Sequence, residues 1–314
     1  MFLYQNITSG QQRMIITVNS FFSGAGLFDI GLIEGGLQIN KAFELDQKAC
    51  ETYRANLGDH IEHCDVTQTT VEDNSQCHGM IFTYPCNRYS TIGDIHGVRT
   101  GDDLFAHALR FIAIGAPEFY VVENVVGMRV FPVVMEAMTR LKQYYVQVFC
   151  PVRSDMWLPQ RRNRLIIIGT RRPFNVRAPE GFRRMRLSEV FEEGARVTVP
   201  GSVLARLNGK YRDLPIISDP ANDDIAPAAV AHYAKDKSTR LIVDKSYPLG
   251  VRPYTVREYA RLQGVPDWVQ FPVSDTEAYR QIGNGVSVPV GIWVAKEMTR
   301  YMNQSSLNPS LPMN

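Results

Sequence analysis

The chain has 314 residues, of which 45% are hydrophobic and 21% are charged, and its formal net charge is +2. This length and composition allow a large buried core, in one large domain or two smaller ones, and exclude a disordered or fibrous protein. No run of 18 apolar residues occurs, and residues 1–13 lack the features of a signal peptide, so we expect a cytoplasmic protein without membrane association.

The near-neutral total hides an uneven distribution of charge. Residues 1–150 carry 10 Lys or Arg against 16 Asp or Glu, whereas residues 151–212 carry 14 against 5. The basic side chains of this segment are almost all arginine, whose planar guanidinium matches phosphate oxygens and the major-groove edge of guanine. The segment therefore predicts contact with nucleic acid, with a solvated basic face as the alternative reading.

The cysteine pattern argues against two kinds of site. Five cysteines are present, an odd number, with wide spacing and no Cys-x-x-Cys pair. Neither a disulfide framework nor a zinc site is indicated, and we expect no metal.

The first predicted elements resemble a nucleotide-binding unit. An apolar run from Met14 to Phe22 leads into Ser23-Gly24-Ala25-Gly26, and an amphipathic stretch follows at 27–33, which predicts a strand, a tight turn and a helix. A second predicted strand ends at Glu44, 20 residues after Gly24. At this distance an acid in a doubly wound sheet reaches the ribose of a bound nucleotide, although glycines in such turns also serve helix packing.

Strand and helix patterns then alternate as far as residue 168. Helices are expected near 47–56, 102–115 and 130–141, and strands are expected to end near 66, 85, 122, 150 and 168. This alternation predicts an α/β fold with a doubly wound, mostly parallel sheet. Ligands bind such sheets at the carboxyl ends of the strands. The stretch from about 173 to 272 lacks periodicity and predicts a smaller, loop-rich module.

Two reactive side chains follow neighbouring predicted strands. Cys86 comes directly after the apolar run at 81–84 and opens a polar loop, and Glu123 ends the apolar run that begins at Phe119. A thiol and a carboxylate at adjacent strand ends indicate covalent chemistry on an electrophilic ring or carbonyl.

Eight segments in order resemble the motifs of the cytosine-C5 DNA methyltransferase family, and the similarity spans residues 14–296. They are Phe22-Ser-Gly-Ala-Gly, Phe43-Glu-Leu-Asp, Cys64-Asp-Val, Tyr84-Pro-Cys-Asn-Arg-Tyr-Ser, Glu123-Asn-Val, Gln160-Arg-Arg-Asn-Arg, residues 252–267 and Gln281-Ile-Gly-Asn-Gly-Val-Ser-Val. A single motif is weak support, but eight in family order make coincidence very improbable.

The resemblance implies the fold, the cofactor and the domain plan. It implies a Rossmann-like S-adenosylmethionine-dependent methyltransferase fold, with S-adenosylmethionine as the methyl donor and S-adenosylhomocysteine as the product. Residues 1–172 would form the catalytic and cofactor-binding domain, and 173–275 a smaller target-recognition domain. Residues 276–314 would return to the catalytic domain. The partner would be double-stranded DNA bound by a monomer, with a companion restriction endonuclease as an open option, in a bacterium or encoded by a phage.

The resemblance also implies catalytic roles. Cys86 would add to C6 of an extruded cytosine, and Glu123 would hold or protonate N3 of the ring. Arg164 would orient Glu123 and stabilise charge at O2, with Arg162 nearer the DNA backbone. The loop from Asn87 to Gly101 is expected to close over the extruded base and to be mobile without DNA.

Further residues are assigned to ligands by the same resemblance. Phe22 would pack on the adenine, the amides of the following turn would face the methionine end, Glu44 would take the ribose and Asp65 the adenine amino group. The expected cofactor-binding residues are Phe22, Ser23, Gly24, Ala25, Gly26, Glu44, Leu45, Asp65, Val66, Pro85, Leu104, Asn284 and Val286. The expected DNA-binding residues are Arg88, Ser90, Arg99, Gln160, Arg183, Arg184, Arg186, Arg206, Lys210 and Arg212.

The sequence departs from the family pattern at several positions. Leu27 stands where a second glycine is usual, and Gly285 replaces a frequent serine. Ser20 takes the place of an aspartate, and Tyr84 that of a proline in many members. Ser20 and Leu27 are expected to reshape the cofactor pocket slightly, and none of these changes removes a reacting group.

Three alternative functions remain open at this point. The tRNA-methylating branch of the family shares the catalytic residues, but its Cys-Phe-Thr signature is absent. A catalytically inactive DNA-binding relative is disfavoured by Cys86, Glu123 and Arg164. A nicotinamide-dependent oxidoreductase would account only for the glycine turn and Glu44.

Overall fold

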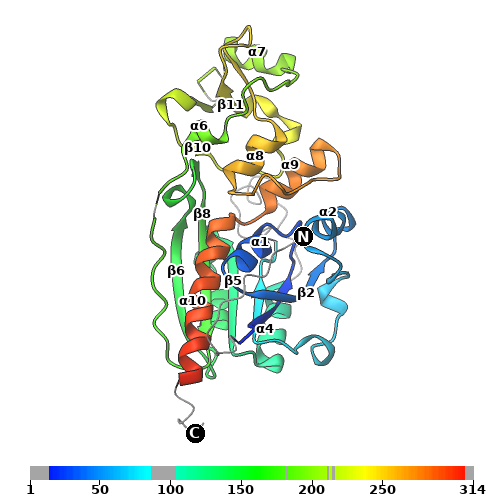
Figure 1. Ribbon diagram of the computed structural model, residues 1–314, viewed down its shortest axis with the longest axis vertical. Helices are drawn as coiled ribbons and strands as arrows, with labels where there is room; N and C mark the ends of the chain where they lie inside the picture. The colour runs from blue at the N-terminus through cyan, green and yellow to red at the C-terminus, as the bar shows by residue number, and fades with distance from the viewer. Residues whose placement is uncertain (1–13, 86–103, 182, 211, 214–215, 308–314) are drawn as a thin grey trace, which may run out of the picture.

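The computed structural model describes residues 14–85, 104–181, 183–210, 212–213 and 216–307 (Figure 1). Cys86, Arg88, Ser90, Arg99 and the predicted closing loop lie outside the described residues. Within the described ranges, no helix combines the length and apolar content needed to cross a membrane.

The described strands form a seven-stranded main sheet in the order β3-β2-β1-β4-β5-β8-β6. Its first five strands in this order run parallel, whereas β8 is antiparallel to both β5 and β6. The prediction of a doubly wound, mostly parallel sheet is confirmed. The strands are β1 (Thr17–Phe21), β2 (Gln38–Glu44), β3 (Ile61–His63), β4 (Gly79–Phe82), β5 (Phe119–Val125), β6 (Tyr145–Arg153) and β8 (Asn163–Thr170).

Helices cover both faces of this sheet, which explains why the central strands are apolar on both sides. Residues 80–82 of β4 and 119–122 of β5 are fully buried. Helices α1 (Leu27–Glu34), α2 (Gln47–Leu57) and α10 (Val288–Leu307) pack on one face. Helices α4 (Leu104–Gly115) and α5 (Pro132–Thr139) pack on the other.

The last helix, α10, packs against the first. A Cβ on Gly31 of α1 would lie 2.2 Å from the carbonyl oxygen of Val288, and one on Gly291 would lie 2.6 Å from the carbonyl oxygen of Phe28. Glycine at both positions lets the two backbones approach closely. Helix α10, near the C-terminus, therefore lies in the same layer as α1 (Figure 1).

A second group of short elements lies at one end of the main sheet (Figure 1). Its strands and helices are β7 (Gln160–Arg161), α6 (Leu187–Val190), α7 (Gly201–Asn208), β9 (Ile216–Ser218), β10 (Ala226–Pro227), β11 (Arg240–Val243), β12 (Val251–Pro253), α8 (Val256–Leu262) and α9 (Asp275–Asn284). Short 3-10 turns connect elements throughout the chain: η1 (Val66–Gln68), η2 (Glu72–Asn74), η3 (Val126–Val130), η4 (Ser154–Met156), η5 (Pro220–Asn222), η6 (Tyr233–Lys235) and η7 (Lys237–Thr239).

A buried ionic network organises this second group. The guanidinium of Arg252 is fully buried and contacts carboxylate oxygens of Asp244 and Glu258, each at 2.7 Å. Glu258 also completes the capping box at the start of α8 with Thr255. A charge buried in this way is tolerated because each ion has a partner with good geometry. The network therefore fixes the position of β12 relative to α8.

A series of hydrogen-bonded side chains lies beneath the turn between β1 and α1 and supports it. Asp29 of α1 is 1% exposed and accepts hydrogen bonds from Ser20 Oγ (2.7 Å) and from the Tyr53 hydroxyl (3.0 Å). The Tyr53 hydroxyl lies 3.0 Å from Nε2 of the half-buried His60. Burial raises the pKa of Asp29 to about 7, against which the two hydrogen bonds act in the opposite direction. Ser20, which replaces the family's usual acid, is therefore paired with an acid nine residues later.

We predict that replacing Asp29 with Asn flattens the pH dependence of stability between about pH 4.5 and 6.5. The folded protein retains a proton on Asp29 that the unfolded chain has released, so the free energy of unfolding falls as pH rises, by at most about 1.4 kcal/mol per pH unit. Urea unfolding at several pH values measures both slopes. Equal slopes in the wild type and the Asp29→Asn variant would contradict the assignment.

Candidate active site

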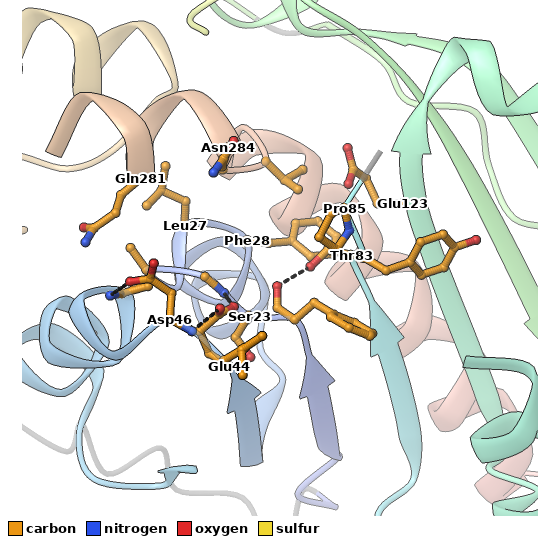
Figure 2. Close-up of a pocket in the computed structure, with 18 of the residues that line it drawn as sticks. Ser23, Leu27, Phe28, Glu44, Asp46, Thr83, Pro85, Glu123, Gln281 and Asn284 are labelled. Carbon is orange, nitrogen blue, oxygen red and sulfur yellow. Dashed lines mark hydrogen bonds between the residues drawn. The ribbon is translucent and has the colours of Figure 1, made fainter. Parts of the chain in front are cut away.

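A cavity of about 630 Å³ lies at the carboxyl ends of the parallel strands. The segments that follow β1 to β5 form its floor, and the end of α9 with the following residues closes the opposite side (Figure 2). This volume lies within the range of small-molecule sites in proteins. The position is the one at which doubly wound sheets bind their ligands.

The turn after β1 has an uncommon backbone. Phe22 adopts φ 62°, in the left-handed region that non-glycine residues rarely enter. Its carbonyl oxygen accepts a hydrogen bond from Thr83 Oγ1 at 2.9 Å, and the amide of Ser23 donates to the carbonyl oxygen of Phe43 at 3.0 Å. These contacts with β2 and the end of β4 hold the turn, so that Phe22 lines the cavity.

The turn glycines use their amides within the protein. Gly24 donates to Glu44 Oε2 at 2.8 Å, and Gly26 donates to the carbonyl oxygen of Ser23 at 3.0 Å. Both amides are thus bonded within the protein, and the assignment of this turn to the methionine end of a ligand stays a prediction. Gly26 does not line the cavity; it has φ 84°, and a Cβ there would lie 2.9 Å from the ring of Tyr53. It is a packing and turn residue.

Two carboxylates face the cavity from β2 and the turn after β3. Glu44 accepts hydrogen bonds from the amides of Gly24 and Asp46, both at 2.8 Å, which fixes its side chain across the turn. Burial raises the pKa of Glu44, and the two amides partly offset this. Asp65 caps η1 through the Thr67 amide at 2.9 Å, and its hydrogen bonds with Thr67 lower its pKa. Asp65 therefore lines the cavity and caps the turn at the same time.

A buried acid–guanidinium pair occupies the β5 side of the cavity. Arg164 Nε lies 2.8 Å from Glu123 Oε1, and both side chains are largely buried. The antiparallel register places Val125 opposite Arg164, so Arg164 meets Glu123 diagonally on the same face of the sheet. Burial raises the pKa of Glu123, while Arg164 and Arg162 lower it by a smaller amount. The net result is a carboxyl group suited to holding a proton above its ordinary pKa.

The adjacent Asn124 holds the end of β4 in place. Its Nδ2 donates to the carbonyl oxygen of Tyr84 at 3.1 Å, and its Oδ1 accepts from the amide of Val125 at 2.8 Å. The Tyr84 side chain turns into the core, where its hydroxyl lies 3.4 Å from Met128 Sδ. Tyr84 is thus a core residue that carries Pro85 to the cavity wall.

Two residues assigned to DNA contact lie inside the protein. The Arg162 side chain, 4% exposed, donates to the carbonyl oxygens of Ala229 (2.7 Å), Gly283 (3.0 Å) and Gly285 (2.7 Å). Gln160 is fully buried and bonds to Leu262, Gln263 and Ala229. The expectations that Arg162 lies near the DNA backbone and that Gln160 binds DNA are wrong, because both side chains are enclosed by the second group of elements.

The other predicted DNA-binding residues that the structure describes lie in the second group of elements. Arg183, Arg186, Lys210 and Arg212 are exposed. Arg184 forms an ion pair with Asp223, and Arg206 contacts Asp236 and Ser238. Arg183 also contacts Glu189 at 3.1 Å and Arg212 contacts Asp213 at 3.9 Å, both at the protein surface, whereas the pairs of Arg184 and Arg206 are more enclosed.

The structure brings most of the predicted cofactor residues together. Those that line the cavity are Phe22, Ser23, Gly24, Ala25, Glu44, Leu45, Asp65, Val66, Pro85, Leu104, Asn284 and Val286, joined by Glu123 and Arg164.

Further lining residues were not among the predicted site residues, and Asp46, Arg280 and Gln281 are the polar ones at the junction of α2 and α9. Arg280 bonds to Asp46 at 2.6 Å, and Gln281 Nε2 donates to the carbonyl oxygen of Lys48 at 3.0 Å. Gln281 belongs to the last motif, which could have marked it. The pairing of Arg280 with Asp46 spans 234 residues and has no local signal.

Among the residues that the structure describes, no group of three His, Cys, Asp or Glu side chains is placed to hold a metal ion. The ligand chemistry of the cavity is instead that of carboxylates, amides and aromatic rings.

Solved structures share this architecture. The chain superposes on Entamoeba histolytica methyltransferase EhMeth with a TM-score of 0.77 and 16% identity, covering 92% of this chain and 99% of that one. For the S. pombe Dnmt2 methyltransferase the TM-score is 0.76, with 19% identity and coverage of 92% and 100%. At these identities the likeness shows the fold alone, which the chain shares with these two methyltransferases.

Sequence comparison then defines the family. Residues 16–210 and 207–300 match the family described as C-5 cytosine-specific DNA methylase, and the chain belongs to this family. Type II methyltransferase M.SsoII of Shigella sonnei is 30% identical, covering 91% of this chain and 80% of the relative. Type II methyltransferase M1.ScrFI of Lactococcus lactis subsp. cremoris is 27% identical, with coverage of 96% and 82%.

We predict that Arg162→Ala lowers the free energy of unfolding by about 3 kcal/mol, since three buried carbonyl groups lose a charged donor. Arg161→Ala is the matched control, because the neighbouring side chain is exposed and its loss should change stability by less than about 0.5 kcal/mol. Chemical unfolding of both variants measures the difference. Equal stabilities would show that the Arg162 contacts contribute little.

Proposed function

We propose that the chain transfers a methyl group from S-adenosylmethionine to C5 of a cytosine extruded from a short site in duplex DNA. The observation that carries this proposal is the Glu123–Arg164 pair beside the cavity, at the sheet edge where β4 leads through Pro85 into Cys86. Membership of the C-5 cytosine-specific DNA methylase family supports the same reaction.

The target carbon requires activation by the protein. Cytosine C5 is a poor nucleophile until electron density enters the ring, and a thiolate that adds to C6 provides it. Cys86 is the residue proposed for this step. Glu123, with its raised pKa, donates a proton or hydrogen bond to N3, and Arg164 orients Glu123 and stabilises charge at O2. Once C5 has gained the methyl group, a base removes the C5 proton, the 5,6 double bond forms again and the Cys86 thiolate leaves.

The cavity fits the proposed cofactor. The half-buried Glu44 and the ionised Asp65 provide acceptors for ribose hydroxyls and an amino group, and Phe22 offers an aromatic surface beside them. Asn284 adds a polar group on the α9 side (Figure 2). When bound, S-adenosylmethionine supplies an electrophilic methyl group. The side chains that line the cavity hold the donor and exclude water from its surroundings.

The DNA-binding surface is assigned to residues 173–275 as the target-recognition domain, with 1–172 and 276–314 as the catalytic domain. Arg183, Arg186, Lys210 and Arg212 are proposed to contact DNA. Unpairing and unstacking the target costs a few kcal/mol, which binding of the loop containing Arg88, Ser90 and Arg99 would offset. The Type II methyltransferase relatives support a restriction-modification role with a companion endonuclease, for a monomer in the cytoplasm of a bacterium or encoded by a phage.

Covalent trapping tests the proposal. Incubation with S-adenosylmethionine and duplex DNA that contains 5-fluorocytosine should give an adduct that survives denaturation, because fluorine at C5 blocks the final elimination. The Cys86→Ser variant should form no adduct but should still bind the cofactor. An adduct with tRNA and none with mixed-sequence duplex DNA would overturn the choice of substrate, and turnover by Cys86→Ser would overturn the choice of nucleophile.

We predict that Glu123→Gln lowers the single-turnover methylation rate at least about 100-fold, because the amide cannot transfer a proton to N3. The wild-type rate should fall as pH rises through the elevated pKa of Glu123, and this dependence should disappear in the variant. Glu118→Gln is the control, because Glu118 is a half-exposed acid at the opposite end of β5. A full rate in Glu123→Gln would remove this residue from the mechanism.

A further inference from the structure

Leu27 and Gly285 face each other in the wall of the cavity, although they are 258 residues apart in the chain. Leu27 is the first residue of α1 and is 1% exposed. Gly285 directly follows α9. Both residues line the cavity, on the side where Figure 2 shows Leu27 near the helix that carries Asn284.

The backbone of Gly285 does not require glycine. Its φ of −63° and ψ of 158° are accessible to any residue. The constraint is steric, because a Cβ at this position would lie 2.5 Å from Leu27 Cδ2 and 3.2 Å from both Leu27 Cβ and Cγ. Glycine is therefore needed at 285 because leucine is present at 27.

Neither residue can move away easily. The Gly285 amide donates to the carbonyl oxygens of Gln281 and Ile282, and its own carbonyl accepts from Arg162 (2.7 Å) and Gln263 (3.1 Å). The Leu27 side chain is packed among buried residues of α1, α8 and α9. Relief of a clash would disturb one of these two contact sets.

The sizes of the two side chains are complementary across this contact. Leu27 occupies the space that a side chain at position 285 would need. A compensating change in size across a tight contact preserves packing, whereas either change alone would leave a cavity or an overlap.

The order of the strands locates this contact relative to the ligand. Glu44 lies at the end of β2 and Glu123 near the end of β5, with β1 and β4 between them. Leu27 follows the turn after β1, so it lies between the proposed ribose site and the proposed target base. The amino-acid half of the cofactor must cross this interval for its methyl group to approach the cytosine.

We propose that Leu27 and Gly285 form a sterically coupled pair that shapes the cavity around the amino-acid half of S-adenosylmethionine. The buried side chain of Leu27 forms part of the cavity wall, and Gly285 provides the space that Leu27 requires. Both are positioning residues and take no part in proton or methyl transfer. The inference rests on the proposed function for the identity of the ligand, whereas the steric coupling of the pair does not.

A double-mutant cycle tests the pair. The variants are Gly285→Ser, Leu27→Gly and the double variant, with thermal unfolding and calorimetric binding of S-adenosylhomocysteine and of adenosine as the measurements. Gly285→Ser alone should lower the affinity for S-adenosylhomocysteine about tenfold and should lower the melting temperature. In the Leu27→Gly background the same serine should cost neither affinity nor stability. Adenosine affinity should remain unchanged by Gly285→Ser, because this ligand lacks the amino-acid half.

Gly201→Ser is the matched control. Gly201 opens α7, and no atom lies within 4 Å of a Cβ built there, so the added group should have no effect on stability or binding. The coupling of the two residues would be overturned if Gly285→Ser lowered stability and affinity equally in both backgrounds, or lowered neither in the wild type. If Gly285→Ser weakened adenosine binding as much as S-adenosylhomocysteine binding, the placement of the pair beside the amino-acid half of the ligand would be overturned. If the wild type binds no S-adenosylhomocysteine, the proposed function fails, and the melting temperatures alone decide whether the two residues are coupled.

Discussion

The guanidinium of Arg162 joins the three parts of the molecule on which the cavity depends. It comes from the segment between β7 and β8, and it binds one carbonyl group near β10 and two at the end of α9. A positive charge surrounded by three carbonyl dipoles remains stable in the interior only while all three partners keep their positions. Through this side chain, the end of α9 is connected both to the start of β8 and to the carbonyl group of Ala229. Any displacement of the second group of elements is transmitted to the wall of the cavity.

This arrangement separates the two arginines of one motif by function. Arg162 and Arg164 are two residues apart, yet one is held by backbone carbonyls and the other by the carboxylate of Glu123. Arg162 therefore supports the fold, whereas Arg164 lines the cavity beside Glu123. A basic cluster in the sequence therefore does not by itself indicate a surface for DNA.

The parts of the structure that were predicted from the sequence follow local rules. Glu44 was found because a fixed distance separates the acid from the turn in doubly wound sheets, and the parallel strands because their apolar runs alternate with helices. Side-chain burial and long-range pairing have no such rule. Gln160 and Arg162 were assigned to DNA because polarity does not reveal enclosure, and the partnership of Asp46 with Arg280 depends on how α9 returns to α2. The antiparallel direction of β8 could not be predicted from the sequence either, because a buried strand has the same apolar pattern in both directions.

The antiparallel pairing of β5 with β8 has a consequence for how the chain can vary. Side chains alternate across a strand, so a slip of one residue would turn Arg164 to the opposite face and leave Glu123 buried without a cation. The length of the connection that precedes β8 is therefore fixed by the ladder. The segment that follows β8 carries no such restriction, because it leaves the sheet at Thr170. A change of length downstream of this strand therefore leaves the register of Glu123 and Arg164 unchanged.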